Sequence, residues 1–450
     1  MIQKKNKTVI SPGCNSAINT DCTSVIIRLD RIILFSILAL FLLLSTGCRK
    51  NKATEEHRVV IWTSCSEFAQ YIELFNKTHK DNRAILVYKD NSALSLPPAK
   101  DELVPDIIVD SWLRNEAFSR SFRSLDYLFD NQILTSELFY PQLLDAGKRK
   151  HSQYLLPVSF NLPAIIFSNE NKDLVTDSYT LTMQQIREIS SPFNQKNKNG
   201  NFTRMGFTVL SNPDFAYLAT KLNGVQFREE KDQIVWSNLR LEQTTDLLRE
   251  WVQTENGSVQ IEEDFAFKYL FMPNYRQVTS GRTLFAYTNS ASLFKMLKEQ
   301  NLDIDYRWIV QDMSIPISDS FMMMGIYKDC NNQVGATEFI RWFFQSESQR
   351  QILERKEAMK LETEMFGISG GFSALRDVTE HILPVFYTHL LTNLPPSQMF
   401  KIPQVLPPRW ESYKSMVVEP YIHNAVSATE GEAIPTIQDL EQEWRKKVFD

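Results

Sequence analysis

Glycine and cysteine are both scarce in this chain of 450 residues, with 14 and five copies respectively. The few glycines form no phosphate-cradling loop, which argues against nucleotide chemistry of that kind. The cysteines do not suggest a disulfide scaffold either, because three of them, Cys14, Cys22 and Cys48, lie near the N-terminus. We expect the remaining two, Cys65 and Cys330, to be buried free thiols.

An excess of basic residues and a cluster of histidines are also missing. The chain has 49 basic and 54 acidic side chains and a formal net charge of -5, which gives no electrostatic reason to expect a nucleic-acid partner. Its six histidines have no ligand-like spacing, so we expect neither a metal site nor a cofactor. Paired acids such as Glu262-Glu263 lack a recognisable catalytic motif. A secreted glycoside hydrolase therefore stays only as a further alternative.

One long apolar run is present, from Ile32 to Leu44, broken only by Ser36. The basic residues before it and the small residues after it are typical of a secretory signal, and the run is short for a membrane span. The residues 45–48, S-T-G-C, resemble the lipobox of bacterial lipoproteins, which implies cleavage before Cys48 and lipidation of its thiol. An uncleaved anchor helix is the alternative. Either arrangement places the rest of the chain outside the cytoplasm, tethered to a membrane.

The remainder of the chain is predicted to be an α/β protein. We expect residues 1–47 to be a lipoprotein signal peptide and the polar residues 48–57 to be a flexible tether. From Arg58 onward, β-rich runs alternate with helical spacing, which predicts mostly parallel sheets flanked by helices. The first predicted elements are a strand at 59–63, a helix from 68, and strands at 84–88 and 106–110.

Candidate ligand contacts follow the predicted strands, because such sheets carry their functional loops at the carboxyl ends of the strands. Ser64 and Glu67 follow the first strand, and Asp110, Ser111 and Trp112 end the third. A carboxylate that accepts hydroxyl groups beside an aromatic plane is suited to a sugar. We therefore expect these residues to take part in a binding site.

The second half of the chain offers further candidates. The segment 154–170 has two closely spaced prolines and is predicted to cross from one lobe to another. A strand is predicted at 206–210 and another at 283–288, and a proline-rich segment spans 395–408. The candidate contacts in these regions are Phe160, Asn161, Ser211, Asn212, Tyr287, Asn289 and Trp410.

The order of these segments resembles the extracellular solute-binding proteins of bacterial ABC importers, in the maltose-binding carbohydrate family. The segments that carry the resemblance are V-V-I-W-T-S from Val59, D-I-I-V-D-S-W from Asp106, L-P-V-S-F-N-L-P from Leu156, F-M-M-M-G-I-Y-K-D from Phe321 and P-P-R-W-E-S-Y from Pro407. They span nearly all of residues 58–450. The low glycine content and the segment G-G-F-S-A-L-R from Gly370 depart from the family pattern and leave the solute open.

The resemblance implies a two-lobed periplasmic-binding-protein fold of type II with several hinge crossings. Lobe 1 would comprise residues 58–160 and 322–395, and lobe 2 residues 161–321 and 396–450. It further implies a monomeric receptor without enzymatic activity that closes on a small solute, most simply a mono- or oligosaccharide, and delivers it to ABC permease subunits. A surface lipoprotein of the same fold, used for sensing or adhesion, is the alternative.

Overall fold

The computed structural model of the chain describes residues 58–175, 179–231, 233–300, 302–359, 365–429 and 431–449. The predicted signal peptide, the lipidation site at Cys48 and the tether lie outside these residues. Residues 56–450 form one compact unit, and the buried cores described below consist entirely of residues from this unit. Within the described part, no helix combines the length and apolar character that a membrane span requires.

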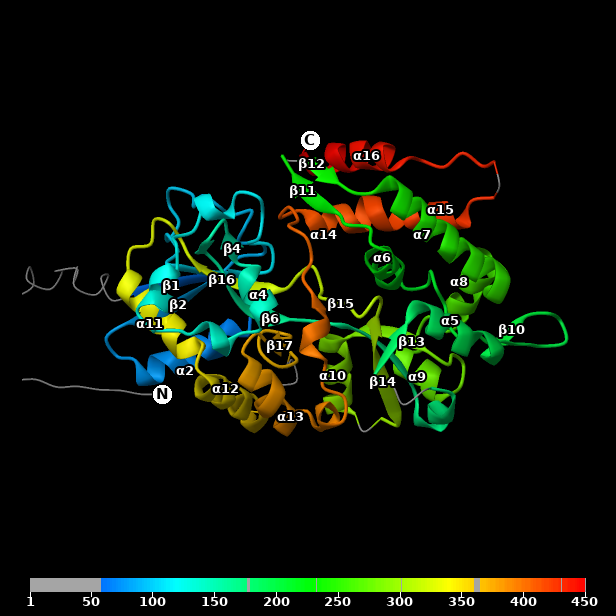
Figure 1. Cartoon of the computed structure of the whole chain (residues 1–450), viewed down its shortest axis with the longest axis horizontal. Coiled ribbons are helices and arrows are strands. Elements are labelled where there is room, and N and C mark those ends of the chain that lie inside the picture. The colour runs from blue at the N-terminus through cyan, green and yellow to red at the C-terminus, as the bar shows by residue number, and fades with distance from the viewer. Residues whose placement is uncertain are drawn as a thin grey trace, which may run out of the picture. The chain divides into compact units, whose positions relative to one another are not determined.

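A six-stranded sheet of order β17-β6-β16-β3-β1-β2 forms the first part of the body (Figure 1). Its strands are β1 (Arg58–Thr63), β2 (Arg83–Tyr88), β3 (Ile107–Asp110), β6 (Leu156–Phe160), β16 (Met322–Ile326) and β17 (Phe372–Ser373). As predicted, β1 lies parallel to β2 and β3. However, β16 pairs antiparallel with both β3 and β6, and β17 pairs antiparallel with β6. The sheet is therefore mixed, because β16 returns directly from the second sheet instead of following a crossover helix.

The second sheet has four strands in the order β13-β7-β14-β8. They are β7 (Pro163–Ser168), β8 (Thr180–Thr182), β13 (Ala286–Asn289) and β14 (Ile304–Val310). Strand β14 is parallel to β8 and antiparallel to β7, which is also antiparallel to β13. The expectation of a mostly parallel sheet is thus wrong here too, although the α/β class is correct.

Helices flank both sheets (Figure 1). Those that accompany the first sheet are α2 (Phe68–Thr78), α3 (Asp126–Asp130), α4 (Pro141–Asp145), α11 (Gln333–Phe343), α12 (Ser346–Met359) and α13 (Leu383–Phe386). Those that accompany the second are α5 (Met183–Ser190), α6 (Pro213–Leu222), α7 (Asn238–Trp251), α8 (Val259–Lys268), α9 (Asn274–Thr279), α10 (Ser290–Glu299), α14 (Trp410–Tyr413), α15 (Glu419–Ser427) and α16 (Ile437–Phe449). Thr182 and Gln185 form a capping box that starts α5, in which each side chain binds the other residue's backbone N–H.

Three segments pass between the two sheets. The chain leaves β6 and enters β7 through Asn161, and it returns from β14 to β16 through β15 (Ile315–Pro316). Strand β15 pairs with β18 (Phe400–Lys401), which belongs to the third crossing. The segments are bonded to one another, since the Ser318 N–H donates to the carbonyl of Asn161 at 3.0 Å. The first two crossings confirm the predicted path of the chain.

Aromatic side chains join the two parts of the body. Phe294 on α10 stacks on Phe366 at a centroid distance of 4.7 Å, and Trp308 on β14 lies 5.9 Å from Phe372 on β17. One buried cluster therefore includes residues from both sheets, whereas a second cluster lies around α6, α7 and α14–α16. Much of the high phenylalanine content is thus core. Cys65 and Cys330 are buried free thiols, as expected.

One predicted strand is absent, and the G-G-F-S-A-L-R segment, for which no role was predicted, has a place in the first sheet. Residues 206–210 are an irregular loop and not a strand. The carbonyl of Gly206 accepts from Leu284 and Phe285, and a Cβ at this glycine would lie 1.9 Å from the Ser190 carbonyl oxygen. The G-G-F-S-A-L-R segment supplies the edge strand β17. Gly371 lets it approach β6, because a Cβ there would lie 2.6 Å from the Phe160 carbonyl oxygen.

Candidate ligand-binding site

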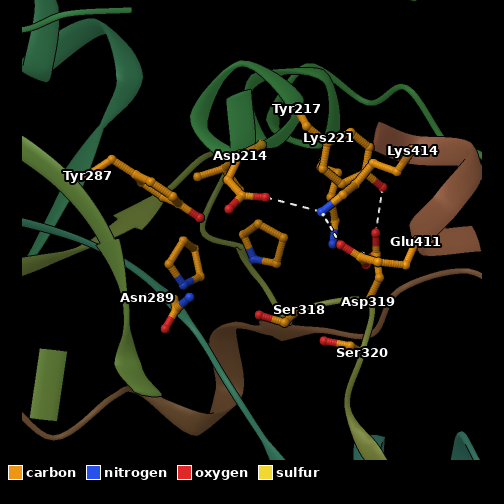
Figure 2. A pocket seen from close by; sticks show the side chains of 13 residues that line it. Asp214, Tyr217, Lys221, Tyr287, Asn289, Ser318, Asp319, Ser320, Glu411 and Lys414 are labelled. Atoms are coloured by element: carbon orange, nitrogen blue, oxygen red, sulfur yellow. Dashed lines mark hydrogen bonds and ion pairs between the residues drawn. The ribbon is translucent and has the colours of Figure 1, made fainter. Parts of the chain in front are cut away.

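A polar cavity of about 240 Å³ opens beside the crossing segments (Figure 2). It is formed by one face of α6, the end of β13, the start of β7, the segment between β15 and β16, and α14 with the residue after it. Its lining residues are Pro163, Asp214, Tyr217, Leu218, Lys221, Tyr287, Asn289, Pro316, Ser318, Asp319, Ser320, Glu411 and Lys414. The cavity thus collects polar groups from segments that are far apart in the sequence.

Helix α6 supplies one wall of the cavity. Its N-terminal cap fixes where the helix starts, and the spacing of its polar residues places them on one face. The Asn212 side chain accepts from the Asp214 N–H, and Pro213 occupies the first turn, which fixes the start of the helix. Asp214, Tyr217 and Lys221 then follow at intervals of three and four residues, which places them on one face of the helix.

Asp319 lines the cavity and is the centre of a hydrogen-bond network in its wall. Its carboxylate accepts from the Tyr217 hydroxyl at 2.5 Å, from Lys221 Nζ at 2.7 Å and from Trp410 Nε1 at 3.2 Å. Burial opposes ionisation of Asp319, but the Lys221 ammonium and the other donors hold the pKa of this carboxyl below its usual value. The network fastens the second crossing segment to α6 and α14.

Lys414 carries the second charged cluster of the cavity. Its ammonium lies 3.1 Å from Asp214, 3.1 Å from Glu411 and 3.7 Å from Glu419, and 5.5 Å from the centre of the Tyr217 ring. Burial disfavours the charge, but the carboxylates of Glu411 and Asp214 raise the pKa of Lys414 above its usual value. Figure 2 shows this ammonium between Asp214 and Glu411.

The hydroxyl and amide groups around the cavity can recognise a polar, uncharged ligand. Figure 2 shows the hydroxyl end of Tyr287 turned toward Asp214, with Ser318 and Ser320 on the side opposite α6. Burial raises the pKa of Tyr287 well above its usual value, so this group stays a neutral hydroxyl that can donate and accept. Asp214 is exposed and offers a second carboxylate oxygen for ligand hydroxyls.

The predicted residues Tyr287 and Asn289 line this cavity, and two others support it. Asn212 caps α6, and Trp410 is fully buried beneath the cavity, where its indole N–H binds Asp319. Ser211 is exposed next to the cap. Trp410 therefore positions the wall through Asp319, and the plane of its ring packs on Tyr413 at 5.7 Å.

The predicted residues at the ends of β1 and β3 form a separate group. Asp110 is buried and accepts from the Ser64 hydroxyl and from the backbone N–H groups of Ser92 and Ser111, each at 2.8 Å. Trp112 extends away from this sheet and packs against the second core cluster. This group connects the loops after three strands of the first sheet.

The residues that follow Trp112 form hydrogen bonds with residues from the second half of the chain. Arg114 donates to the carbonyl of Pro403 at 3.2 Å, and the Glu116 N–H donates to Glu229 at 2.8 Å. Burial lowers the pKa of Arg114 to about 10, although the nearby Asp319 opposes the shift. Arg114, four residues after Asp110, thus links this loop to the segment of Pro403 and lies near Asp319.

Three other predicted residues have structural partners. Glu67 is buried and forms an ion pair with Lys356 at 2.8 Å, while its other oxygen accepts from the Tyr71 hydroxyl at 2.7 Å. Phe160 is fully buried and lies 5.0 Å from the Phe400 ring. Asn161 binds the Gly370 carbonyl and the Ser290 hydroxyl, which joins the first crossing to α10. A ligand role for these residues stays a prediction.

Sequence reasoning missed the charged residues of the cavity and also Tyr217, Ser318 and Ser320. Asp214, Tyr217 and Lys221 carry a usable signal, since an aspartate, a tyrosine and a lysine at helical spacing share one face. Asp319 and Lys414 carry no such signal, because only packing brings their segments to α6. Within the part of the chain that the structure describes, no group of three or more histidine, cysteine, aspartate or glutamate side chains could hold a metal ion.

No protein-family model and no curated protein matches the sequence, but solved structures match nearly the whole chain. The ABC substrate-binding protein Lmo0181 from Listeria monocytogenes, in complex with cycloalternan, has a TM-score of 0.57 and 14% identity, over 87% of this chain and 98% of its own. The cyclic alpha-maltosyl-1,6-maltose binding protein from Arthrobacter globiformis has a TM-score of 0.56 and 12% identity, over 87% and 97%. The maltose/maltodextrin-binding domain MalE from Bdellovibrio bacteriovorus, bound to maltotriose, has a TM-score of 0.53 and 12% identity, over 87% and 100%.

These matches confirm the predicted fold class. The chain has the α/β fold of type II periplasmic-binding proteins, which is the fold of sugar-binding ABC transporter receptors. The structures it resembles are named as binding proteins and not as enzymes. At this level of identity the likeness extends to the fold and not to the solute.

Proposed function

We propose that this protein is an extracytoplasmic receptor that binds a small polyhydroxylated solute, in the first place a mono- or oligosaccharide, and delivers it to the permease of an ABC importer. The observation that carries the proposal is the polar cavity beside the crossing segments of a fold shared with sugar-binding receptors. Tyr287, Asn289, Ser318 and Asp214 would bind the hydroxyl groups of the solute. Tyr287 also offers the apolar ring face that a sugar requires.

The proposed mechanism is closure of two lobes over the solute. Lobe 1 would comprise residues 58–160 and 322–395, and lobe 2 residues 161–321 and 396–450. A ligand that contacts both lobes only in the closed state shifts the population toward closure, which a permease can then detect. The crossings at Asn161 and Ser318 are bonded to each other, so a bend there would move both segments together.

The proposal includes a lipid anchor at Cys48 after cleavage of the signal peptide 1–47. It rests on the lipobox-like residues 45–48 and on the known arrangement of such receptors. Metabolic labelling with a radioactive fatty acid should mark the wild-type protein and should fail to mark Cys48→Ser. Equal labelling of the two proteins would contradict the anchor without affecting the solute site.

The solute site is tested by thermal-shift screening of the body from Arg58 against mono- and oligosaccharides. A ligand that binds only the folded state raises the midpoint by mass action. For a sugar that binds, Tyr287→Phe should weaken the affinity about tenfold, because one buried hydrogen bond contributes about 1–1.5 kcal/mol. The matched control is Tyr88→Phe, since Tyr88 is 57% exposed and lies outside the cavity.

Two outcomes would contradict this proposal. A sugar whose affinity is unchanged in both Tyr287→Phe and Asp214→Asn must bind elsewhere, so the cavity would be wrong. The absence of any saccharide ligand, together with the absence of permease genes beside this one, would favour the sensing or adhesion role of the same fold.

A further inference from the structure

The end of helix α8 exposes a compact group of large apolar side chains. Phe267 is 77% exposed, Leu270 63% and Phe271 97%, and we call these three residues the apolar tip. Leu270 and Phe271 lie three and four residues after Phe267, and the Leu270 N–H donates to the Phe267 carbonyl at 3.2 Å, so the helical spacing continues past the end of α8. Single exposed apolar residues are ordinary, but a contiguous group of this size marks a contact surface.

The apolar tip is held on a small core of its own. Phe265 on α8 packs with Phe202 and Met205, which belong to or follow the hairpin of β9 (Gln195–Lys196) and β10 (Phe202–Arg204), and Tyr269 packs against this cluster. Figure 1 shows α8 and the β10 hairpin together at the right-hand end of the view. The tip is therefore presented by packed structure and does not hang from a loose loop.

Basic side chains border the small core that carries the apolar tip. Lys268 lies 5.3 Å and Arg282 5.6 Å from the centre of the Tyr269 ring. Lys196 Nζ lies 4.6 Å from the centre of the Phe202 ring in the same small core. We give the name basic ring to five exposed basic residues of the hairpin, of α8 and of the stretch from α9 to β13, which are Lys196, Arg204, Lys268, Arg276 and Arg282.

The acidic residues closest in sequence are Glu263 and Asp264, one turn before Phe267. Glu263 is engaged, since its carboxylate lies 2.9 Å from Nε2 of His423 on α15. The five exposed members of the basic ring outnumber these two exposed acidic residues, on a chain whose formal net charge is -5.

We propose that the apolar tip and its basic ring bind an anionic lipid surface. Exposed phenylalanine and leucine can enter the boundary between headgroups and acyl chains, while lysine and arginine around them attract anionic headgroups. The charge of the ring favours this occupant over an apolar protein groove, which would leave five cations unpaired. The inference does not rest on the proposed solute, and it would add a second membrane contact to a lipid anchor, which together give stable attachment.

The test measures binding of the body from Arg58 to sedimenting lipid vesicles at low salt. This part contains its own cores, and a cooperative thermal transition checks its folding. The wild type should bind vesicles that contain phosphatidylglycerol at least tenfold more tightly than vesicles of phosphatidylcholine alone, and added salt should remove the difference. The double variant Leu270→Ser/Phe271→Ser should lose at least tenfold in binding, because it removes two exposed apolar side chains that would enter the lipid.

Two further variants separate charge from apolar insertion. Lys268→Glu/Arg276→Glu should abolish the preference for phosphatidylglycerol. The control Leu391→Ser, at a side chain that is 70% exposed elsewhere, should bind as the wild type does. Failure of the wild type to bind anionic vesicles would overturn the proposal, and so would equal binding by the Leu270→Ser/Phe271→Ser variant. A dimer of the wild type that this variant dissociates, without vesicle binding, would assign the apolar tip to a second copy of the chain instead.

Discussion

Replacement of Asp319 by asparagine tests the network that supports the cavity. The carboxylate and the ammonium of Lys221 are 2.7 Å apart, and their side chains are only 9% and 15% exposed. In Asp319→Asn, Lys221 would keep its bond to the Ile317 carbonyl at 2.9 Å but would lose its counter-charge. Loss of one partner from a buried ion pair costs about 3–5 kcal/mol, and because both side chains are slightly exposed we expect a loss of about 3 kcal/mol.

The measurement is urea unfolding near pH 7 with two comparison variants. Lys221→Met/Asp319→Asn removes both charges and should recover most of the loss, since no uncompensated ion is left in the interior. Asp145→Asn breaks an ion pair of 2.6 Å whose side chains are 43% and 64% exposed, and it should change the unfolding free energy by less than about 1 kcal/mol.

The pH dependence gives a second measurement of the same group. The folded-state pKa of Asp319 is lowered, so its stabilisation is complete above the unfolded value of about 3.9 and is lost as the pH falls through the folded value. Asp319→Asn should therefore flatten the acid limb of stability. An Asp319→Asn protein that loses less than about 1 kcal/mol at pH 7, or a double variant less stable than it, would refute the reasoning.

Three further predictions concern other buried groups. Burial raises the pKa of Glu262 from 4.5 to about 7, so its stabilising contribution is full below about pH 4.5 and falls as the pH rises through 7. Glu262→Gln should flatten thermal stability over this window, and Asp264→Asn, at an exposed carboxylate, should not. Lys356→Met leaves Glu67 buried without its partner and should lower the free energy of urea unfolding by about 3 kcal/mol. Amide exchange at residues 365–371 should become faster, and unchanged exchange would contradict the role of this pair. Trp410→Ala should destabilise the ligand-free protein by about 3–5 kcal/mol, because the indole is fully buried; a ligand-free midpoint equal to that of the wild type would instead support a direct stacking role.

Local elements of the fold could be predicted wherever the pattern is self-contained. The run from Val59 to Thr63 and the helix that begins at Phe68 follow from apolar spacing, and both occur as expected. Residues 206–210 show the limit of that reasoning. Their apolar side chains are buried in a loop, because the backbone N–H groups of Leu210 and Ser211 bind the buried Glu262 and do not pair with a strand.

The candidate site was predicted in part. Tyr287 and Asn289 were found because polar residues that end a strand lie at a sheet edge, and both line the cavity. Trp410 was predicted as a ligand contact, and that role stays a prediction. The sequence could not show that α14 packs its ring against Tyr413 and its N–H against Asp319.

The sequence by itself determined the α/β class and the passage of residues 154–170 between the two sheets, because each depends on residues within a few turns of one another. Only the tertiary structure decided the mixed strand directions and the meeting of Asp214, Asp319 and Lys414 around one cavity. These groups lie far apart along the chain, so their distances are set by the packing of α6, α14 and the second crossing. The physical reason is that periodicity and caps are local properties, whereas a cavity lined by several segments exists only after the cores have formed.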